Sequence, residues 1–407
     1  RPATHLVPAV KVPIDPVARP GAAGGAASGQ SKGAMMRPFE MPIAGAALFA
    51  AVVAGVALRR RIVATFMPAE ACAESVAMMA TASTVVTEQY ISEGVLFQRM
   101  GLSHRDINFK NWYRVGHIVA QELRIDHDNL SEAEAVRIYH FYLPVLEWVR
   151  QQIAEVVQAH VEAGDPDRAP VIGLSCPQGG GKTTLVHVLR SVLLHEGTMS
   201  VALSIDDFYL PHEDLQKVAD ASPDNPLLQG RGNPGTHDVA LGAATLRRLT
   251  HWRPGGRVPV PRYDKSARGG AGDRLPPGQW PVVTERPQVV FFEGWCLGFE
   301  PVAAAALCDP CLAPVNAALG EQFEAWTGAL DALVVVQVED PEYVYEWRRE
   351  AEREMKGRSG AGMSDAEVTR FCDRCMPAYR QYLPGLYTAA VVPRQLRLEI
   401  GADRAPV

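Results

Sequence analysis

The chain has 407 residues, of which 47% are hydrophobic and 21% charged, so it is long enough for two domains and can bury a large core. Its net charge of −6 argues against a nucleic-acid-binding surface. Its seven cysteines, an odd number in so long a chain, exclude a small disulfide-stabilised scaffold.

Residues 1–85 differ in composition from the rest of the chain. They are rich in Ala, Gly, Pro and Val, and the uncharged stretch 41–58 precedes the basic run 59–61. A leader with few acids, an apolar stretch and a basic stop is typical of organelle targeting, although a stretch of this length also fits a membrane anchor. We expect a partly disordered targeting segment over 1–85, with membrane contact through 41–58 as the alternative.

Residues 86–165 have a helical pattern. Ser131 and Glu134 form a capping-box signature, and the apolar stripe that follows is typical of core packing. Pro144 falls inside this pattern and is expected to kink the helix. We therefore predict a helical N-terminal region over 86–165, joined by a short linker to a second domain over 166–407.

A glycine-rich turn opens this second domain. The apolar run Val171–Leu174 predicts a buried strand, and the sequence LVHVLRSVLL after Thr184 has the apolar spacing of a helix. Strand, glycine turn, Lys-Thr and helix are the order of a phosphate-binding P-loop. Cys176 stands where that pattern has its first glycine, and we expect it to pack beneath the loop. The candidate nucleotide-binding residues are Gly179, Gly180, Gly181, Lys182, Thr183 and Thr184.

Carboxylates follow two further apolar runs. Asp206 and Asp207 come at the end of the predicted strand 201–210, and Glu293 follows the apolar run 289–292. Because the carboxyl ends of parallel strands meet at one edge of a sheet, these side chains are expected beside the phosphates. One aspartate would activate a substrate hydroxyl, while Thr183, Glu293 and the other aspartate would hold Mg²⁺ directly or through water. Another apolar run, 332–340, predicts a strand that is buried on both faces.

Two polar segments, 227–238 and 258–274, are candidates for binding an acidic substrate. Arginine suits a carboxylate, whereas tyrosine and aspartate suit hydroxyls, although a solvated loop is the ordinary explanation of such segments. The candidate substrate-binding residues are Arg231, His237, Arg262, Tyr263, Asp264 and Lys265. The charged helical stretch near 345–365 contains Arg348, which we predict to act on the phosphates from a lid.

Taken together, these segments resemble the plant and cyanobacterial type of D-glycerate 3-kinase, within the phosphoribulokinase and uridine kinase group of P-loop kinases. The likeness extends from about residue 87 to the C-terminus. The motifs that carry it are YHFYLPV, GLSCPQGGGKTTL, LSIDDFYL, RGNPGTHD, VPRYDKSARGGAGDR, FFEGWCLGF, WRREAE and MPAYRQYLPGLY. The resemblance implies an α/β P-loop kinase, with a mostly parallel sheet flanked by helices.

The family implies a reaction and a role for each candidate. ATP and Mg²⁺ would be the cofactors, and the γ-phosphate would pass to the 3-hydroxyl of D-glycerate to give 3-phosphoglycerate. Asp206 would be the catalytic base, with Lys182 and Arg348 as further catalytic residues, and Glu293 the Walker-B acid. In plants this reaction belongs to photorespiration, which fits a chloroplast leader. We expect a monomer that binds a small molecule and no nucleic acid; location at a membrane or in the cytoplasm is the alternative.

Other functions stay open at this point. The same scaffold also serves kinases of sugars, nucleosides or pantothenate-like alcohols, and the acceptor segment decides between them. A nucleotide-switch GTPase that handles metal is disfavoured because the chain lacks an N-K-x-D motif. A membrane-tethered ATP-binding module would not need a base such as Asp206. The pairs Cys308/Cys311 and Cys372/Cys375 resemble a zinc or redox set, but their wide separation favours incidental cysteines.

Overall fold

The computed structural model describes residues 86–102, 107–359 and 363–407. The predicted leader 1–85, with its apolar stretch 41–58, lies outside the described residues. Within the described part, no helix combines the length and the apolar character that crossing a membrane requires.

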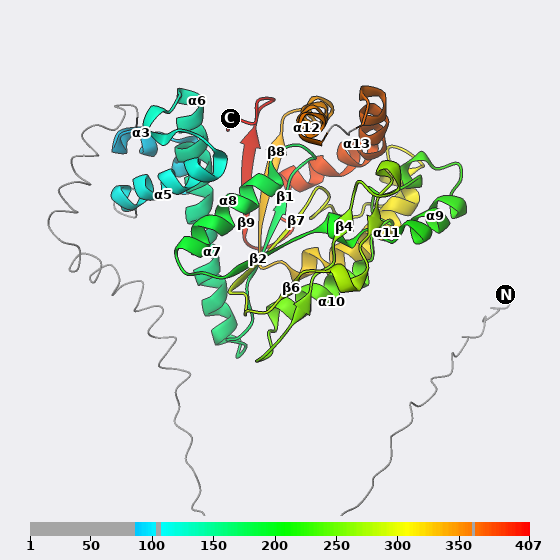
Figure 1. Cartoon of the computed structure of the whole chain (residues 1–407), viewed down its shortest axis with the longest axis horizontal. Helices are drawn as coiled ribbons and strands as arrows, with labels where there is room; N and C mark the ends of the chain where they lie inside the picture. The colour runs from blue at the N-terminus through cyan, green and yellow to red at the C-terminus, as the bar shows by residue number, and fades with distance from the viewer. Residues whose placement is uncertain (1–85, 103–106, 360–362) are drawn as a thin grey trace, which may run out of the picture. The chain divides into compact units, whose positions relative to one another are not determined.

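A parallel five-stranded sheet, in the order β2-β7-β1-β8-β9, forms the centre of the fold (Figure 1). Its strands are β1 (Val171–Ser175), β2 (Ser200–Ser204), β7 (Val289–Gly294), β8 (Ala332–Val338) and β9 (Gln395–Ile400). β1, β7 and nearly all of β8 are buried, as expected for strands covered on both faces. The predicted α/β architecture with a mostly parallel sheet is therefore confirmed.

Helices cover both faces of this sheet and pack against it through two hydrophobic clusters, one on each face. One cluster joins the sheet to the N-terminal helices and to α8 (Lys182–His195). The other joins the opposite face to α10 (Val239–Thr250), α11 (Leu312–Ala325) and α13 (Asp365–Thr388). Consecutive strand residues alternate between the clusters: Phe291 belongs to the first and Phe292 to the second.

The N-terminal region is helical, as the periodicity predicts. Its helices are α3 (Glu88–Ser92), α4 (Val95–Arg99), α5 (Phe109–Leu123), α6 (Glu132–Ala135) and α7 (Leu143–Glu162). Ser131 and Glu134 form the predicted capping box at the start of α6. The residues between α6 and α7 form a π-helical stretch, Val136–Tyr142, that ends just before Pro144. Proline has no N–H to give to the preceding turn, which explains why the helix widens there.

Short elements and the last helices complete the fold. The minor strands are β3 (Val258–Pro259), β4 (Tyr263–Asp264), β5 (Asp273–Arg274) and β6 (Val282–Val283), and they pair as two small antiparallel ribbons, β3 with β6 and β4 with β5. The remaining helices are α9 (His212–Ala221) and α12 (Tyr343–Ser359). Asp238 caps α10, and Ser364 with Glu367 forms a capping box on α13.

Candidate active site

The glycine turn connects β1 to α8, as the P-loop pattern requires. Gly179 and Gly181 have positive φ angles of 83° and 91°, and a Cβ on Gly179 would lie 2.5 Å from the Cβ of Trp347. Cys176 is 1% exposed, and its sulfur lies 2.3 Å from where a Cβ on Gly180 would be. Burial raises the pKa of the Cys176 thiol to about 12, so this residue packs beneath the loop as an uncharged small side chain.

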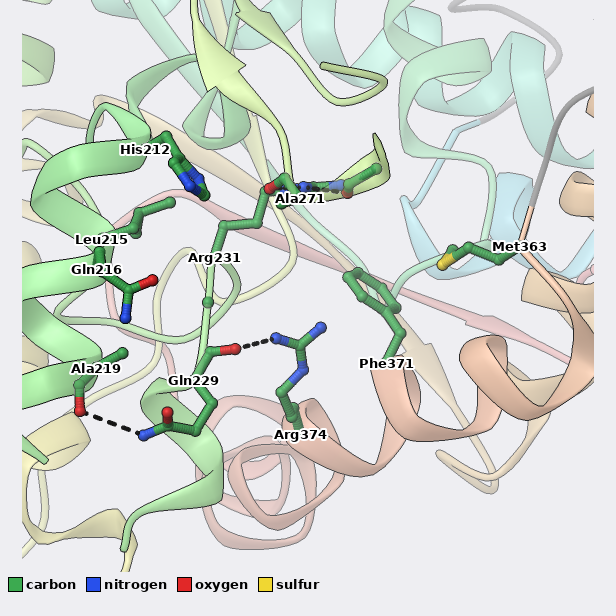
Figure 2. Close-up of a pocket in the computed structure, with 12 residues that line it drawn as sticks. His212, Leu215, Gln216, Ala219, Gln229, Arg231, Ala271, Met363, Phe371 and Arg374 are labelled. Atoms are coloured by element: carbon green, nitrogen blue, oxygen red, sulfur yellow. Dashed lines mark hydrogen bonds between the residues drawn. The ribbon is translucent and has the colours of Figure 1, made fainter. Parts of the chain in front are cut away.

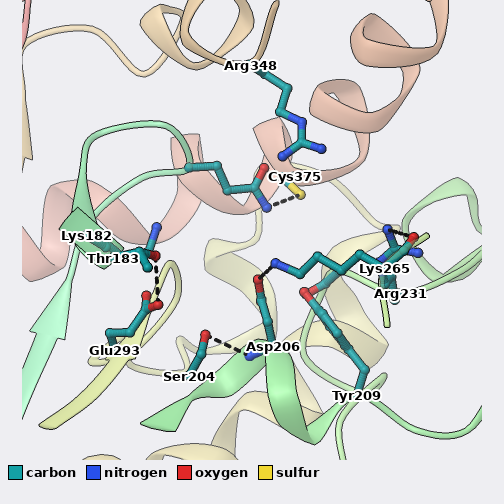
Figure 3. A network of polar contacts seen from close by, with 12 residues as sticks. Lys182, Thr183, Ser204, Asp206, Tyr209, Arg231, Lys265, Glu293, Arg348 and Cys375 are labelled. Carbon is teal, nitrogen blue, oxygen red and sulfur yellow. Dashed lines mark hydrogen bonds and ion pairs between the residues drawn. The ribbon is translucent and has the colours of Figure 1, made fainter. Parts of the chain in front are cut away.

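Two oxygen donors meet beside this loop. The hydroxyl of Thr183, in the first turn of α8, donates to the Glu293 carboxylate at 3.1 Å, and Glu293 stands at the carboxyl end of β7 (Figure 3). Burial raises the pKa of Glu293, while Lys182 opposes that shift. An all-oxygen pair in this position fits Mg²⁺, which prefers one or two carboxylates and otherwise keeps water or phosphate as ligands. Lys182 itself donates to the carbonyls of Cys176 at 2.9 Å and Pro177 at 3.3 Å.

Asp206 lies at the end of the neighbouring strand. β2 ends at Ser204, and Asp206 occupies a 3₁₀ turn, Ile205–Phe208, rather than the strand itself. Its carboxylate accepts from the Lys265 ammonium at 2.6 Å (Figure 3). Burial disfavours the carboxylate form, but Lys265 and Lys182 outweigh burial and hold the pKa of Asp206 well below its usual value. Asp206 is therefore ionised over the whole physiological pH range and can accept a hydrogen bond from a hydroxyl.

Asp207 has a different environment from its neighbour. Its carboxylate pairs with the Arg262 guanidinium at 2.8 Å, and burial raises its pKa while Arg262 opposes the rise. Asp207 was predicted to hold metal and Arg262 to bind substrate. The structure brings these two residues together with each other and places the Thr183 hydroxyl on Glu293.

His237 is buried next to this pair of aspartates. It is 6% exposed, its ring stacks on Tyr209 with centroids 4.4 Å apart, and the Trp326 ring meets it edge-on at 5.7 Å. Neither ring nitrogen has a hydrogen-bond partner among the described residues. Burial lowers the pKa of His237 to about 4, although the charge of Asp206 opposes this, so the imidazole is neutral at pH 7.

A cavity of about 360 Å³ is lined by residues of α9 and α13 and of the loops around Gly230 and Gly270 (Figure 2). Arg231 and Arg374 both line it, Arg231 from the loop before α10 and Arg374 from α13. Arg231 donates to the carbonyls of Gly270 and Ala271, and Arg374 donates to the Gln229 carbonyl at 2.9 Å. Two guanidinium groups that line one cavity are suited to a carboxylate or phosphate ligand.

Comparison with known proteins identifies the family. No family model matches the chain. The chloroplastic D-glycerate 3-kinase of Arabidopsis thaliana is 38% identical over 328 residues, which are 78% of this chain and 72% of the relative. The kinase mug58 of Schizosaccharomyces pombe, which is uncharacterized, is 36% identical over 60% of this chain and 92% of its own. The solved structure of D-glycerate 3-kinase from Cryptococcus neoformans var. grubii matches with 32% identity and a TM-score of 0.57, over 65% of this chain and 97% of that one. This chain belongs to the D-glycerate 3-kinase family.

Within this kinase, three further predicted residues, Tyr263, Asp264 and Arg348, have different environments. Tyr263, 9% exposed, lies beneath the Arg231 guanidinium, which is 5.7 Å from the centre of its ring. Asp264 accepts from the N–H and hydroxyl of Ser266 at 2.9 and 2.6 Å, contacts that shape the β4–β5 ribbon. Arg348 extends from α12 toward the site (Figure 3), where it pairs with buried Glu352 and lies over the Phe371 ring.

Helix α13 contributes site residues that were not among the candidates predicted from the sequence. Arg374 lines the cavity, while the Tyr379 hydroxyl accepts from the backbone N–H of Gln178 in the P-loop at 2.9 Å. The Gln178 side chain reaches the sulfur of Cys375 at 3.7 Å. Arg374 lies between the two cysteines of the second CxxC pair. A basic residue in this position could have indicated an anion-binding site, but the pair suggested metal or redox chemistry.

The CxxC pairs occupy separate sites. Cys372 and Cys375 are buried on α13, whereas Cys308 is exposed and Cys311 partly exposed before α11, and all four are free thiols. They do not form a metal-binding group within the described residues. A Cys₄ zinc centre is therefore not formed by these side chains.

The C-terminal segment also reaches the nucleotide loop. The Arg404 guanidinium donates to the Gly179 carbonyl at 2.8 Å and lies over the Trp347 ring at 5.1 Å. The Trp347 indole in turn donates to the Ala402 carbonyl at 2.6 Å. These contacts pack a segment more than two hundred residues away in sequence against the P-loop. The nearby Trp347 side chain leaves no room for a Cβ at position 179.

Proposed function

We propose that this kinase transfers the γ-phosphoryl group of ATP to the 3-hydroxyl of D-glycerate and releases 3-phosphoglycerate. Family membership over 78% of the chain supports the reaction, since the relative that covers it is a D-glycerate 3-kinase. The catalytic assignment depends on the environment of Asp206. This residue is an ionised carboxylate just after β2, in the polar network that also contains Lys182 and Glu293 (Figure 3).

ATP would bind at the β1–α8 turn. Backbone N–H groups of Gly179, Gly180, Gly181 and Thr184 would hold phosphate oxygens, and Lys182 would leave the loop carbonyls for the β- and γ-phosphates. Thr183 and Glu293 would hold Mg²⁺, with Asp207 as a further ligand through water, and the ion would supply neutralisation of phosphate charge. Arg348 would act on the same phosphates from α12. Each group neutralises charge or aligns oxygens, which is most of what phosphoryl transfer demands.

D-glycerate would lie between Asp206 and the cavity. We assign its carboxylate to Arg231 and Arg374, because two guanidinium groups there match a planar anion. Its 3-hydroxyl would donate to Asp206 in place of the Lys265 ammonium, which would turn to the acceptor or the γ-phosphate. His237, Arg262, Tyr263 and Asp264 would shape this end of the site around the two ligands.

Mg²⁺, photorespiration, a monomeric state and location in the chloroplast also belong to this proposal. The Arabidopsis thaliana relative is chloroplastic by name, and the composition of residues 1–85 is that of an organelle leader. Closure of the 345–365 region over the substrates remains a prediction.

The test is ADP release by the full chain with Mg-ATP and, in turn, D-glycerate, L-glycerate, ribulose 5-phosphate and uridine. Turnover confined to D-glycerate is expected. Turnover with ribulose 5-phosphate or uridine would keep the kinase scaffold and overturn the acceptor. ADP release that no acceptor stimulates, in folded protein that binds ATP, would overturn phosphoryl transfer to a small alcohol.

A further inference from the structure

A guanidinium group near the C-terminus contacts the nucleotide loop and is not among the residues assigned to the proposed reaction. Arg404 follows the last strand, β9, and its Nε donates to the Gly179 carbonyl at 2.8 Å. One of its terminal nitrogens pairs with the Glu350 carboxylate at 2.6 Å, and the group lies 5.1 Å from the centre of the Trp347 ring. One side chain therefore joins the C-terminal segment to the P-loop and to α12.

Helix α12 presents one face to this junction. Trp347 and Glu350 are three residues apart, so they lie on the same side of the helix. Trp347 is 1% exposed and packs against the glycine turn, while its indole N–H donates to the Ala402 carbonyl. The same helix carries Arg348, which we predict to act on the phosphates. The junction therefore fixes the P-loop relative to the helix that supplies this arginine.

The peptide that Arg404 contacts lies between two glycines. A peptide group is planar and directs its C=O and N–H to opposite sides, and glycine on either side removes the Cβ clashes that oppose its reversal. The Gly180 N–H of this peptide donates within the loop to the Pro177 carbonyl at 3.2 Å, while the Gly179 C=O accepts from Arg404. A reversed peptide would direct that C=O into the loop, where it would repel phosphate oxygens, so the contact with Arg404 opposes the reversal.

Stability alone does not account for an arginine at this position. The side chain of Arg404 is 33% exposed and that of its partner Glu350 is 40% exposed, and such surface ion pairs stabilise a fold only slightly. The backbone of Arg404 has a φ of 63°, in the left-handed region that arginine rarely adopts. Backbone strain of this kind is often found at functional sites, where the surrounding contacts maintain it. Both observations favour a role at the P-loop over a role in packing.

We propose that Arg404 is a positioning residue for ATP, which keeps the Gly179–Gly180 peptide in the orientation that admits phosphates and couples the loop to α12. The proposal rests on the ATP site assigned above to the β1–α8 turn. Lys182 also holds loop carbonyls, but it would leave them for the phosphates, whereas Arg404 contacts the loop from the C-terminal segment and would stay. Without Arg404, a smaller fraction of molecules holds the competent loop, and the apparent nucleotide affinity falls by that fraction. Transfer from ATP that is already bound would proceed at the normal rate.

The experiment is calorimetric titration of the full chain with a non-hydrolysable ATP analogue and Mg²⁺, which measures nucleotide binding whichever alcohol accepts the phosphate. Arg404→Ala should weaken binding about tenfold and raise KM for ATP equally, while kcat and KM for D-glycerate stay within about threefold. Arg404→Lys keeps the charge but not the planar fork, so its affinity should lie between those of wild type and alanine. Arg397→Ala is the matched control and should leave affinity unchanged, since Arg397 is an exposed arginine of β9 that donates to the Tyr387 carbonyl.

A second variant tests the contact with α12. Glu350→Gln removes the ion pair but leaves the Gly179 contact, so affinity should fall only about two- to threefold, and Arg404→Ala/Glu350→Gln should bind no more weakly than Arg404→Ala. Circular dichroism verifies that each variant folds; if Arg404→Ala does not, wild-type affinity in Arg404→Lys would overturn the proposal. Unchanged affinity in folded Arg404→Ala, an equal loss in Arg397→Ala, or a fall in kcat larger than the fall in affinity would also overturn it. Wild-type protein that binds the analogue but does not turn over D-glycerate would overturn the acceptor and leave the role of Arg404 standing.

Discussion

In the proposed site, the nucleotide end comes from one turn and one adjacent strand, whereas the acceptor end draws on four separate segments of the chain. Gly179 to Thr184 are contiguous, and Glu293 stands on the strand that pairs directly with β1. Asp206, Arg231, Lys265 and Arg374 come instead from a 3₁₀ turn, two loops and the last long helix. The first end is made largely of backbone, the second almost wholly of side chains.

This difference has a consequence for charge. At the nucleotide end, Lys182 rests on backbone carbonyls that it can leave at small cost. At the acceptor end, Asp206 pairs with Lys265 and Asp207 with Arg262, so the charges balance one another without a ligand. In the proposed site, an acceptor would therefore displace existing ion pairs, while phosphates would meet a loop whose geometry is already set. Substitutions at the acceptor end should accordingly leave ATP binding intact.

The largest effect is expected from Asp206→Asn. The amide keeps the shape but cannot take the hydroxyl proton, so kcat should fall about 10²- to 10⁴-fold, the usual contribution of a general base. Steady-state kinetics with D-glycerate measures this, and calorimetric titration with an ATP analogue should show nucleotide affinity within threefold of wild type. A variant that turns over at the normal rate would remove Asp206 from the mechanism, and lost ATP affinity would break the separation of the two ends.

The sequence carries the nucleotide end well because its geometry depends on local spacing. A strand, a glycine turn and a helix in succession determine where Lys182 and Thr183 point, and an acid after an apolar strand places Glu293. The parallel sheet follows from buried apolar runs with helical patterns between them. The role of Cys176 could also be predicted, since a small side chain at this position packs beneath the glycine turn.

The acceptor end was harder to predict from the sequence, because long-range packing determines which of its side chains meet. Arg231 and Lys265 were identified as candidates, but nothing in their local sequence says that Lys265 faces Asp206 while Arg262 faces Asp207. Arg374 reaches the cavity because α13 packs on one face of the sheet and also contacts the P-loop. The strand predicted over 201–210 ends early, at Ser204, since the turn that bears the aspartates leaves the sheet.

The next effect concerns the pH dependence of stability. His237 has a folded-state pKa of about 4 and an ordinary value of 6.5, so the unfolded chain binds more protons between these pH values. Stability contributed by neutral His237 is fully present above pH 6.5 and is lost as pH falls toward 4, by about 3 kcal/mol. In His237→Phe, the fall in unfolding free energy between pH 7 and pH 4 should be smaller by about this amount in urea titrations. An equal fall in both proteins would show that His237 is not buried in its neutral form.

Arg374→Ala should raise KM for D-glycerate about 10- to 100-fold, as expected for the loss of a charge-assisted hydrogen bond of about 1.5–3 kcal/mol. The KM for ATP should stay within threefold, because Arg374 lines the cavity rather than the P-loop. Arg374→Lys keeps the charge but loses the planar fork, so its KM should lie between those of wild type and alanine. Unchanged KM for D-glycerate in Arg374→Ala would move the acceptor carboxylate away from α13, and an increase for ATP alone would assign Arg374 to the nucleotide end.

The smallest effect is expected from Arg262→Ala. This substitution distinguishes two roles of Arg262, pairing with Asp207 and binding of the substrate. The Arg262 side chain is 38% exposed and pairs with Asp207, 18% exposed, so its loss should lower the free energy of unfolding by about 1 kcal/mol. If that pairing is its main role, KM for D-glycerate changes less than threefold, in contrast to Arg374→Ala. Asp207→Asn and the double variant complete a thermodynamic cycle, in which the double change should cost less than the sum of the single changes. A rise in KM above tenfold in Arg262→Ala would instead place Arg262 on the substrate, and the acceptor end would then exchange both of its aspartate ion pairs when glycerate binds.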